Sequence, residues 1–449
     1  MAPLYWLVWL ALFSGSSAGD AWDNFANNLA TDLAPILQLF GEQVSKQFLS
    51  ESTTIWDNII FAMAPLGILT AVVSAIRVCG SPLLKAFVGR AQEGAGIAEA
   101  ELCSSTGRDV CEMYQNGAIT RVFGRPKILE FVHDPHQENF YAAEGEEKVA
   151  SAGLYTFKEY YKTERGKREW VELRKSPRKR PRTEEDASSR SPDDFAPNPN
   201  LMLNIGFRNP SRCVLRPFAV VAVLMQASVM VFAVVVQKSL KLTREGRLPP
   251  PWALPTTIIG TVLLCTGMFM CAFLIEQSTI ERMFTRPKAP TKHPQPRSVM
   301  HWIQPGGQVV GDQSFDSFAY SDKDRPLRQY ISSWRKPVSQ HESLMTWITV
   351  IITMIGFVVQ FVGLRGVHSA VSVCQLAAVV IMSALRALLR TKRLEGDANR
   401  IPSEFIQNAS GRPGHELDWL AFELCHMHGQ LKPVQDGMAY SWVRQPARE

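Results

Sequence analysis

The residues best suited to chemistry by type and spacing form the cluster Cys425-His426-Met427-His428, three potential metal ligands within four positions. His426 and His428 are two positions apart, which on a helix points them to different sides. A zinc site also needs a fourth ligand, and His415 is the only nearby candidate. We interpret the cluster as polar positions of a surface helix rather than as a metal site.

Three further motifs lack the context that their chemistry requires. Residues 15–19 (GSSAG) match G-x-S-x-G but lie in a predicted signal segment instead of a strand–turn–helix. Residues 306–311 (GGQVVG) lack the lysine of a phosphate-binding loop and indicate a turn. Residues 133–136 (HDPH) indicate a turn with exposed imidazoles. We therefore predict no catalytic, cofactor-binding or metal-binding residue, no cofactor, and a protein that is not an enzyme.

The stretches that position everything else are apolar. Residues 344–364 and 369–389 are two runs of 21 residues joined by RGVH. Each run is long enough to cross about 30 Å of hydrocarbon as a helix. A backbone in lipid must satisfy its own hydrogen bonds, so the pair is predicted to form two antiparallel transmembrane helices. A buried helix pair in a soluble core is the alternative, which two consecutive runs of this length disfavour.

We predict an all-α integral membrane protein with about five transmembrane helices after an N-terminal signal sequence, with a mixed cytoplasmic loop region and disordered segments. Within the first loop, residues 89–114 favour helix and residues 117–134 favour strand and turn. The chain is predicted to begin with a signal peptide or uncleaved anchor (1–18) and a non-cytoplasmic amphipathic segment (19–58). The five predicted spans are residues 59–76, 217–236, 252–275, 344–364 and 369–389. The predicted cytoplasmic parts are the loop 77–216, with a basic and disordered part at 158–200, the loop 276–343 and the tail 390–449.

The charge distribution sets the predicted orientation. The net charge is +6, and cations flank most of the apolar runs on the side that this model places in the cytoplasm. The exception is the linker between the second and third spans, with Lys238, Lys241, Arg244 and Arg247. We expect a multi-pass protein of the plasma membrane or an endomembrane.

A basic run at residues 158–182 holds eleven Lys and Arg residues. We rank three interpretations: it keeps the loop in the cytosol, it contacts anionic lipid, or it binds nucleic acid. The multi-span architecture disfavours the last. Expected partners are the lipid bilayer, anionic lipid through this run and unknown cytosolic proteins, with no nucleic acid.

The interiors of the predicted spans contain no charged residue, which lowers the odds of a proton-coupled transporter. Gln226, Gln360 and Gln375 are their mid-span polar groups, and such amides usually bond across helices. Two glycine pairs recur at seven residues, Gly260 with Gly267 and Gly356 with Gly363. We interpret them as close-packing surfaces between spans, or between subunits of a homo-oligomer.

Several stretches between residues 59 and 396 resemble a group of filamentous-fungal multi-pass membrane proteins of unknown function. They include FAMAPLGILTAVVSAIRVCG, GTVLLCTGMFMCAFLIEQST and HWIQPGGQVVGDQSFDSFAYSD. The resemblance implies a membrane protein and brings no catalytic or ligand-binding residue. Some members of the group carry ankyrin repeats, and this chain departs from them because it lacks a TPLHxA-type repeat.

Two functional hypotheses follow. The first is a non-enzymatic, membrane-anchored interaction or signalling component whose cytoplasmic parts bind partners. The alternative is a channel or transporter for a neutral or weakly polar solute.

Overall fold

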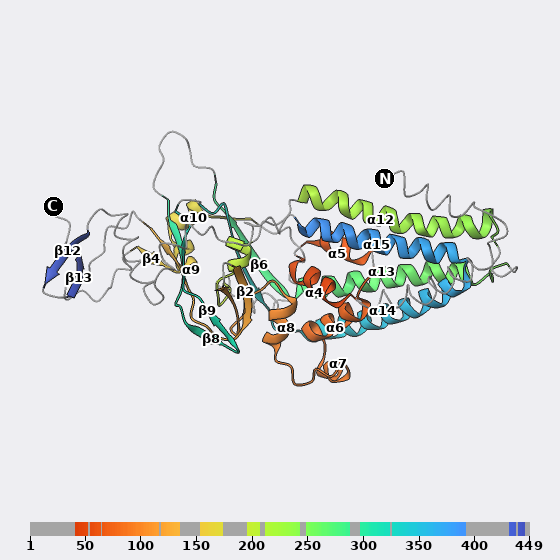
Figure 1. Cartoon of the computed structure of the whole chain (residues 1–449), viewed down its shortest axis with the longest axis horizontal. Coiled ribbons are helices and arrows are strands. Elements are labelled where there is room, and N and C mark those ends of the chain that lie inside the picture. The colour runs from red at the N-terminus through yellow and green to blue at the C-terminus, as the bar shows by residue number, and fades with distance from the viewer. Residues whose placement is uncertain are drawn as a thin grey trace. The chain divides into compact units, whose positions relative to one another are not determined.

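The computed structural model of the chain (Figure 1) describes residues 41–52, 54–63, 65–115, 118–134, 153–173, 195–206, 212–242, 248–287, 297–323, 326–391, 431–436 and 439–444. The chain forms two compact units. The helical unit comprises the described parts of Met1–Ser104, Asn209–Thr279 and Lys336–Lys392, and the β unit those of Ser105–Arg208, Ile280–Arg335 and Arg393–Glu449. The predicted signal segment 1–18 and the cluster at residues 425–428 lie outside the described residues.

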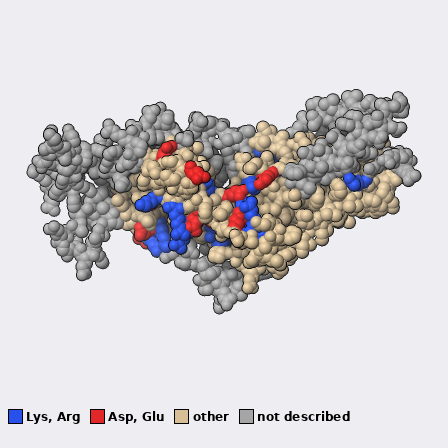
Figure 2. Space-filling view, turned by 60° about the horizontal axis from the view of Figure 1, so that its bottom comes forward, with Lys and Arg blue, Asp and Glu red and all other residues tan. Residues whose placement is uncertain are grey.

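Four long apolar helices form a bundle in the helical unit. They are α12 (Arg212–Val234, extended by the π-helical turn η3, Val235–Ser239), α13 (Ala253–Gln277), α14 (Gln340–Gly366) and α15 (Ser369–Thr391). All four are long and apolar enough to cross a membrane, and they coincide with four of the five predicted spans. On the face that Figure 2 shows, most of the described surface of the helical unit is uncharged. The bundle is therefore compatible with insertion into a bilayer.

The first predicted span, residues 59–76, is not one helix but two, α5 (Ile55–Ala62) and α6 (Ile68–Cys79). Pro65 cannot donate to a helical hydrogen bond, and Gly67 lies in the left-handed region at φ 70°. Asn58 of α5 donates to Glu276 (2.5 Å), and the Cys79 thiol at the end of α6 donates to the Leu274 carbonyl (3.5 Å). Because both contacts are at the C-terminal end of α13, the segment enters and leaves at one end of the bundle. The single continuous helix predicted for residues 59–76 is therefore not present.

Helices α13 and α14 pack against each other along a seam of small residues. The α14 side of this seam consists of Thr346, Thr349, Thr353, Gly356, Gln360 and Gly363, all buried at alternating spacings of three and four. A Cβ atom at Gly356 would lie 2.5 Å from the Leu264 backbone nitrogen, and one at Gly363 would lie 2.5 Å from that of Thr257. The backbones approach so closely that only glycine fits. The predicted packing role of these glycines is confirmed between helices of one chain.

Three shorter helices complete the helical unit: α4 (Glu42–Glu51), α7 (Pro82–Phe87) and α8 (Ala95–Leu102). Arg77 at the end of α6 is buried and binds Glu93 (2.5 Å) and Glu101 (2.6 Å). The hydrogen bonds from Arg77 hold the pKa of Glu93 below its usual value. This ion-pair cluster ties the chain that follows α6 back to the bundle.

The β unit is built from both predicted cytoplasmic loops. The first loop supplies β1 (Val110–Gln115), β2 (Ala118–Phe123), β3 (Leu129–His133), β4 (Leu154–Tyr155), β5 (Val171–Glu172), α9 (Phe157–Lys162), α10 (Glu164–Glu169) and η2 (Met202–Gly206). The second supplies β6 (Thr279–Thr285), β7 (Val299–Gln304), β8 (Gln308–Val310), β9 (Gln313–Phe315), β10 (Phe318–Ser321) and β11 (Gln329–Arg335). A further hairpin joins β12 (Leu431–Asp436) and β13 (Ala439–Arg444).

Two sheets interleave strands of the two loops, in the orders β10-β7-β3-β4 and β11-β6-β5. Antiparallel pairing of β3 with β7 sets Phe131 opposite His301. Aromatic side chains dominate the core, and the Phe157 and Tyr330 rings stack with centroids 3.8 Å apart. The prediction of an all-α fold is therefore corrected, because the loops form a single sheet-containing unit. Residues 110–114, for which helix was favoured, belong to β1, whereas the strands expected within residues 117–134 are present as β2 and β3.

Candidate functional site

A buried charged side chain of another helix contacts the interruption between α5 and α6. Arg386 of α15 is 1% exposed and donates to the carbonyl oxygens of Ile60 (3.2 Å) and Phe61. These carbonyls lie in the last turn of α5, where no later helical residue reaches them and the helix dipole is negative. The guanidinium carbon also lies 5.1 Å from the centre of the Phe61 ring and 5.5 Å from that of Phe48. Arg386 therefore caps the broken helix.

Neutral polar groups link the long helices elsewhere in the bundle. Gln226 of α12 donates to Gln375 of α15 (3.1 Å), and Gln360 of α14 donates to Thr261 of α13 (3.0 Å). Both contacts are buried. They confirm the predicted bonding of these amides across helices.

In the β unit, Arg286 joins the two loops. It is 5% exposed, and its Nη1 donates to Asp322 (3.0 Å), while its Nε lies 3.1 Å from Glu169. Its guanidinium carbon lies 4.3 Å from the centre of the Trp170 ring. Glu169 also accepts from the Tyr160 hydroxyl (2.6 Å). Burial raises the pKa of Asp322, and the positive charge of Arg286 acts in the opposite direction. The cluster fixes residues of the first loop against the second.

Glu130 of β3 forms a second link between the loops. Its carboxylate accepts from the Trp302 indole (2.6 Å) and from the Tyr330 hydroxyl (2.7 Å). Burial raises the pKa of Glu130, and the two donors act in the opposite direction. Burial and the neighbouring Glu130 charge raise the pKa of Tyr330. This arrangement is suited to holding β3, β7 and β11 together.

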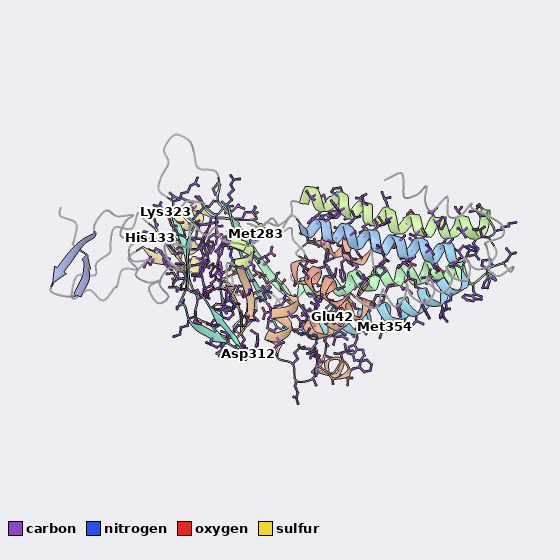
Figure 3. All side chains as sticks on the ribbon, in the orientation of Figure 1. Glu42, His133, Met283, Asp312, Lys323 and Met354 are labelled. Atoms are coloured by element: carbon purple, nitrogen blue, oxygen red, sulfur yellow. The ribbon has the colours of Figure 1, made fainter. Side chains whose placement is uncertain are left out.

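His301 of β7 is a buried imidazole that sequence reasoning did not single out. Neither of its ring nitrogens has a hydrogen-bond partner among the described residues. Its ring stacks on Phe131 with centroids 5.0 Å apart. Burial, with smaller contributions from His133 and Lys323, lowers the pKa of His301 to about 3. His133 and Lys323 are both labelled in Figure 3, close together in the β unit. The His301 ring is therefore neutral at physiological pH.

The motifs that the sequence analysis examined do not converge. Gly307 and Gly311 lie in turns on either side of β8 with positive φ, as the turn interpretation predicts. His133 ends β3, and its ring centroid lies 6.4 Å from that of His301. Among the residues that the structure describes, no three His, Cys, Asp or Glu side chains are grouped as metal ligands. Instead, Arg386, Arg286 and Glu130 each contact at least one residue more than 100 positions away in the chain, namely Ile60, Glu169 and Tyr330. Local spacing contains no signal for such contacts.

Comparison with known proteins gives no relative. No protein-family model, curated protein or solved structure matches this chain. The resemblance to fungal multi-pass membrane proteins therefore stays a prediction, and the function is argued from the two units themselves.

Proposed function

We propose that the protein is a non-enzymatic, membrane-anchored interaction component, whose helical unit resides in the bilayer and whose β unit binds a cytosolic partner. The observation that carries this proposal is that two loops, separated in the chain by two apolar helices, form one unit with a shared core. Half-buried Glu130 and buried Arg286 stabilise that union. A rigid unit is a suitable platform for a binding surface.

The connectivity supports a single side for the whole β unit. Helices α12 and α13 lie between its two loops in the chain, so two crossings return the chain to the side from which it left. The crossings by α14 and α15 do the same. Cations near this side of the bundle, among them Arg77, Arg90 and Arg216, favour the cytoplasm. The plasma membrane or an endomembrane remains the proposed location.

This four-crossing arrangement differs from the orientation that a signal sequence predicts. Because α5 and α6 return to one end of α13, α4 shares the side of the β unit. A cleaved signal followed by a crossing at residues 59–76 would instead place α4 outside. We propose the four-crossing arrangement.

Three apolar side chains exposed on adjoining segments of the β unit are proposed to contribute to the partner surface. Val309 of β8 is 70% exposed, Leu129 of β3 51% and Phe123 of β2 49%. The three segments lie next to one another. The Gln308 side chain accepts a hydrogen bond from the Lys127 backbone N–H (2.5 Å) and donates one to the Lys127 carbonyl (2.8 Å). A Cβ atom at Gly124 would contact the Val310 side chain. Exposed apolar patches on folded proteins commonly mark interaction sites.

Proximity labelling in cells tests this function. We expect a reproducible set of cytosolic neighbours for the wild-type protein, and loss of part of that set in the variant Val309→Asp. Val171→Asp, at an exposed position on β5, is the matched control and should keep the full set. A wild-type protein without reproducible cytosolic neighbours would contradict the proposal.

A channel or transporter for a neutral or weakly polar solute is the second candidate. Interrupted helices within membrane bundles often form solute sites, and the α5–α6 break with Arg386 is such an interruption. Solute flux through purified protein in liposomes, abolished by Arg386→Leu in a variant that remains folded, would favour this candidate. Absence of flux for every solute screened would argue against it.

A further inference from the structure

Helix α7 exposes apolar side chains immediately beside the bundle. Its N-cap is Ser81, whose hydroxyl accepts from the Leu84 backbone, and Pro82 occupies the first turn. Leu84 is buried in the core of the helical unit, which fixes the orientation of the helix. Leu83 and Phe87, four positions apart and so on a shared face, are 69% and 88% exposed. Water is an unfavourable surrounding for such a face.

The face continues an apolar surface of the bundle. The Trp347 indole on α14 donates to the Ser81 hydroxyl (3.2 Å), which joins the start of α7 to that helix. Trp347 lies one turn from Leu344 and Ile351, which are 57% and 50% exposed on the outside of α14. Tryptophan is enriched where the hydrocarbon of a bilayer meets its headgroups. The outer surface of α14 and the exposed face of α7 are therefore continuous through Trp347.

Positive charge accompanies the apolar face. Lys85 is in the last turn of α7, and Arg90 follows it with a side chain that is 52% exposed. Exposed apolar groups next to cations match the interface of a bilayer, where acyl chains meet phosphate groups.

We propose that α7 is an interfacial membrane anchor, with Leu83 and Phe87 inserted among the acyl chains and Arg90 at the level of the lipid phosphates. This inference rests on the proposed membrane residence of the helical unit. It adds a lipid contact outside the four crossing helices and fixes the depth of the bundle at the α7 side of the bilayer.

Spin labels attached to single introduced cysteines test the proposal in liposomes of phosphatidylcholine with phosphatidylserine. Three variants are compared: Phe87→Cys on α7, Ile351→Cys on the outside of α14 and Val309→Cys on the β unit. Wild-type protein, in which the described cysteines are buried or half-buried, gives the background signal. Collisional relaxation by oxygen reports lipid, and relaxation by a water-soluble nickel chelate reports solvent.

We expect the label at position 87 to favour oxygen over the nickel chelate, as the label at position 351 does, and the label at position 309 to show the reverse. If position 351 reports lipid while position 87 matches position 309, the anchor is disproved and the membrane bundle stands. If position 351 also reports solvent, the proposed membrane residence fails, and the anchor fails with it. In the double variant Leu83→Glu with Phe87→Cys, the oxygen preference should fall at least twofold.

Discussion

Arg386 donates a hydrogen bond to the carbonyl oxygen of Ile60 across 3.2 Å, although 326 positions separate the two residues in the sequence. The contact couples α15 to α5. It also accounts for how a helix can end inside a bundle, because the carbonyls released at the break receive a donor.

Replacing Arg386 should destabilise the helical unit. Arg386→Leu leaves two buried carbonyls without this donor, and a hydrogen bond from a charged group contributes about 1.5–3 kcal/mol. We expect the free energy of unfolding in detergent micelles to fall by about that amount, measured by denaturant titration. Arg365→Leu is the control, because Arg365 is exposed near the end of α14, where its guanidinium carbon lies 4.8 Å from the centre of the Phe361 ring. An equal loss in both variants would contradict the capping role.

The α13–α14 seam predicts a second effect on stability. In Gly356→Leu the new side chain would collide with the backbone of Leu264, so the helices must separate. Overpacking of this kind costs about 1–3 kcal/mol. Ile355→Leu changes the neighbouring outward position, which is 51% exposed, and should leave the unfolding midpoint unchanged. Thermal unfolding of both variants in the same detergent distinguishes a seam from a tolerant surface.

The four long apolar helices could be predicted from composition, because an uncharged run of about 20 residues has few folded alternatives. The break at Pro65 and Gly67 could also have been noticed, since both residues interrupt helices, but the apolar composition of residues 59–76 outweighed them. The amide contacts of Gln226 and Gln360 were predictable in kind, and their partners were not.

Local patterns predicted the strands within residues 117–134, but the strand pairing that builds the β unit was beyond prediction from them. Strand β3 pairs with β7, on the far side of two apolar helices in the chain, and a single sequence contains no register for such a pairing. The roles of Arg286 and Glu130 could not be predicted for the same reason, because their partners lie in the other loop. Arg386 lies near the end of the predicted span 369–389, and its contacts with the carbonyls of α5 have no signal in the local sequence.

The Glu130–Tyr330 hydrogen bond gives a pH-dependent prediction. Burial raises the pKa of Glu130, so the folded protein favours its protonated form, and its contribution to stability is lost as pH rises through the raised pKa. The Tyr330 donor opposes that shift. Tyr330→Phe should therefore cost about 1–3 kcal/mol at a pH above the raised pKa of Glu130, where the carboxylate is charged, and less at a pH below that pKa.

Denaturant unfolding at the two pH values measures this difference. Tyr161→Phe is the control. Among the described residues the Tyr161 hydroxyl has no hydrogen-bond partner, and the Tyr161 ring packs against the same aromatic core. A loss in Tyr330→Phe that is the same on both sides of the Glu130 titration would contradict a charged Glu130 as the acceptor.

The position of α4 decides between four crossings and five. Gln43 lies on the exposed side of α4, so a Gln43→Cys thiol should be open to a water-soluble maleimide. With four crossings, it should react only after the membrane is permeabilised, as Val309→Cys in the β unit does. Leu248→Cys, in the linker between α12 and α13, should react in intact cells. Wild-type protein supplies the background labelling. If Gln43→Cys instead reacts without permeabilisation, as Leu248→Cys does, the chain crosses the membrane between α4 and the β unit. The contacts of Asn58 and Cys79 with α13 then cannot both form in the membrane.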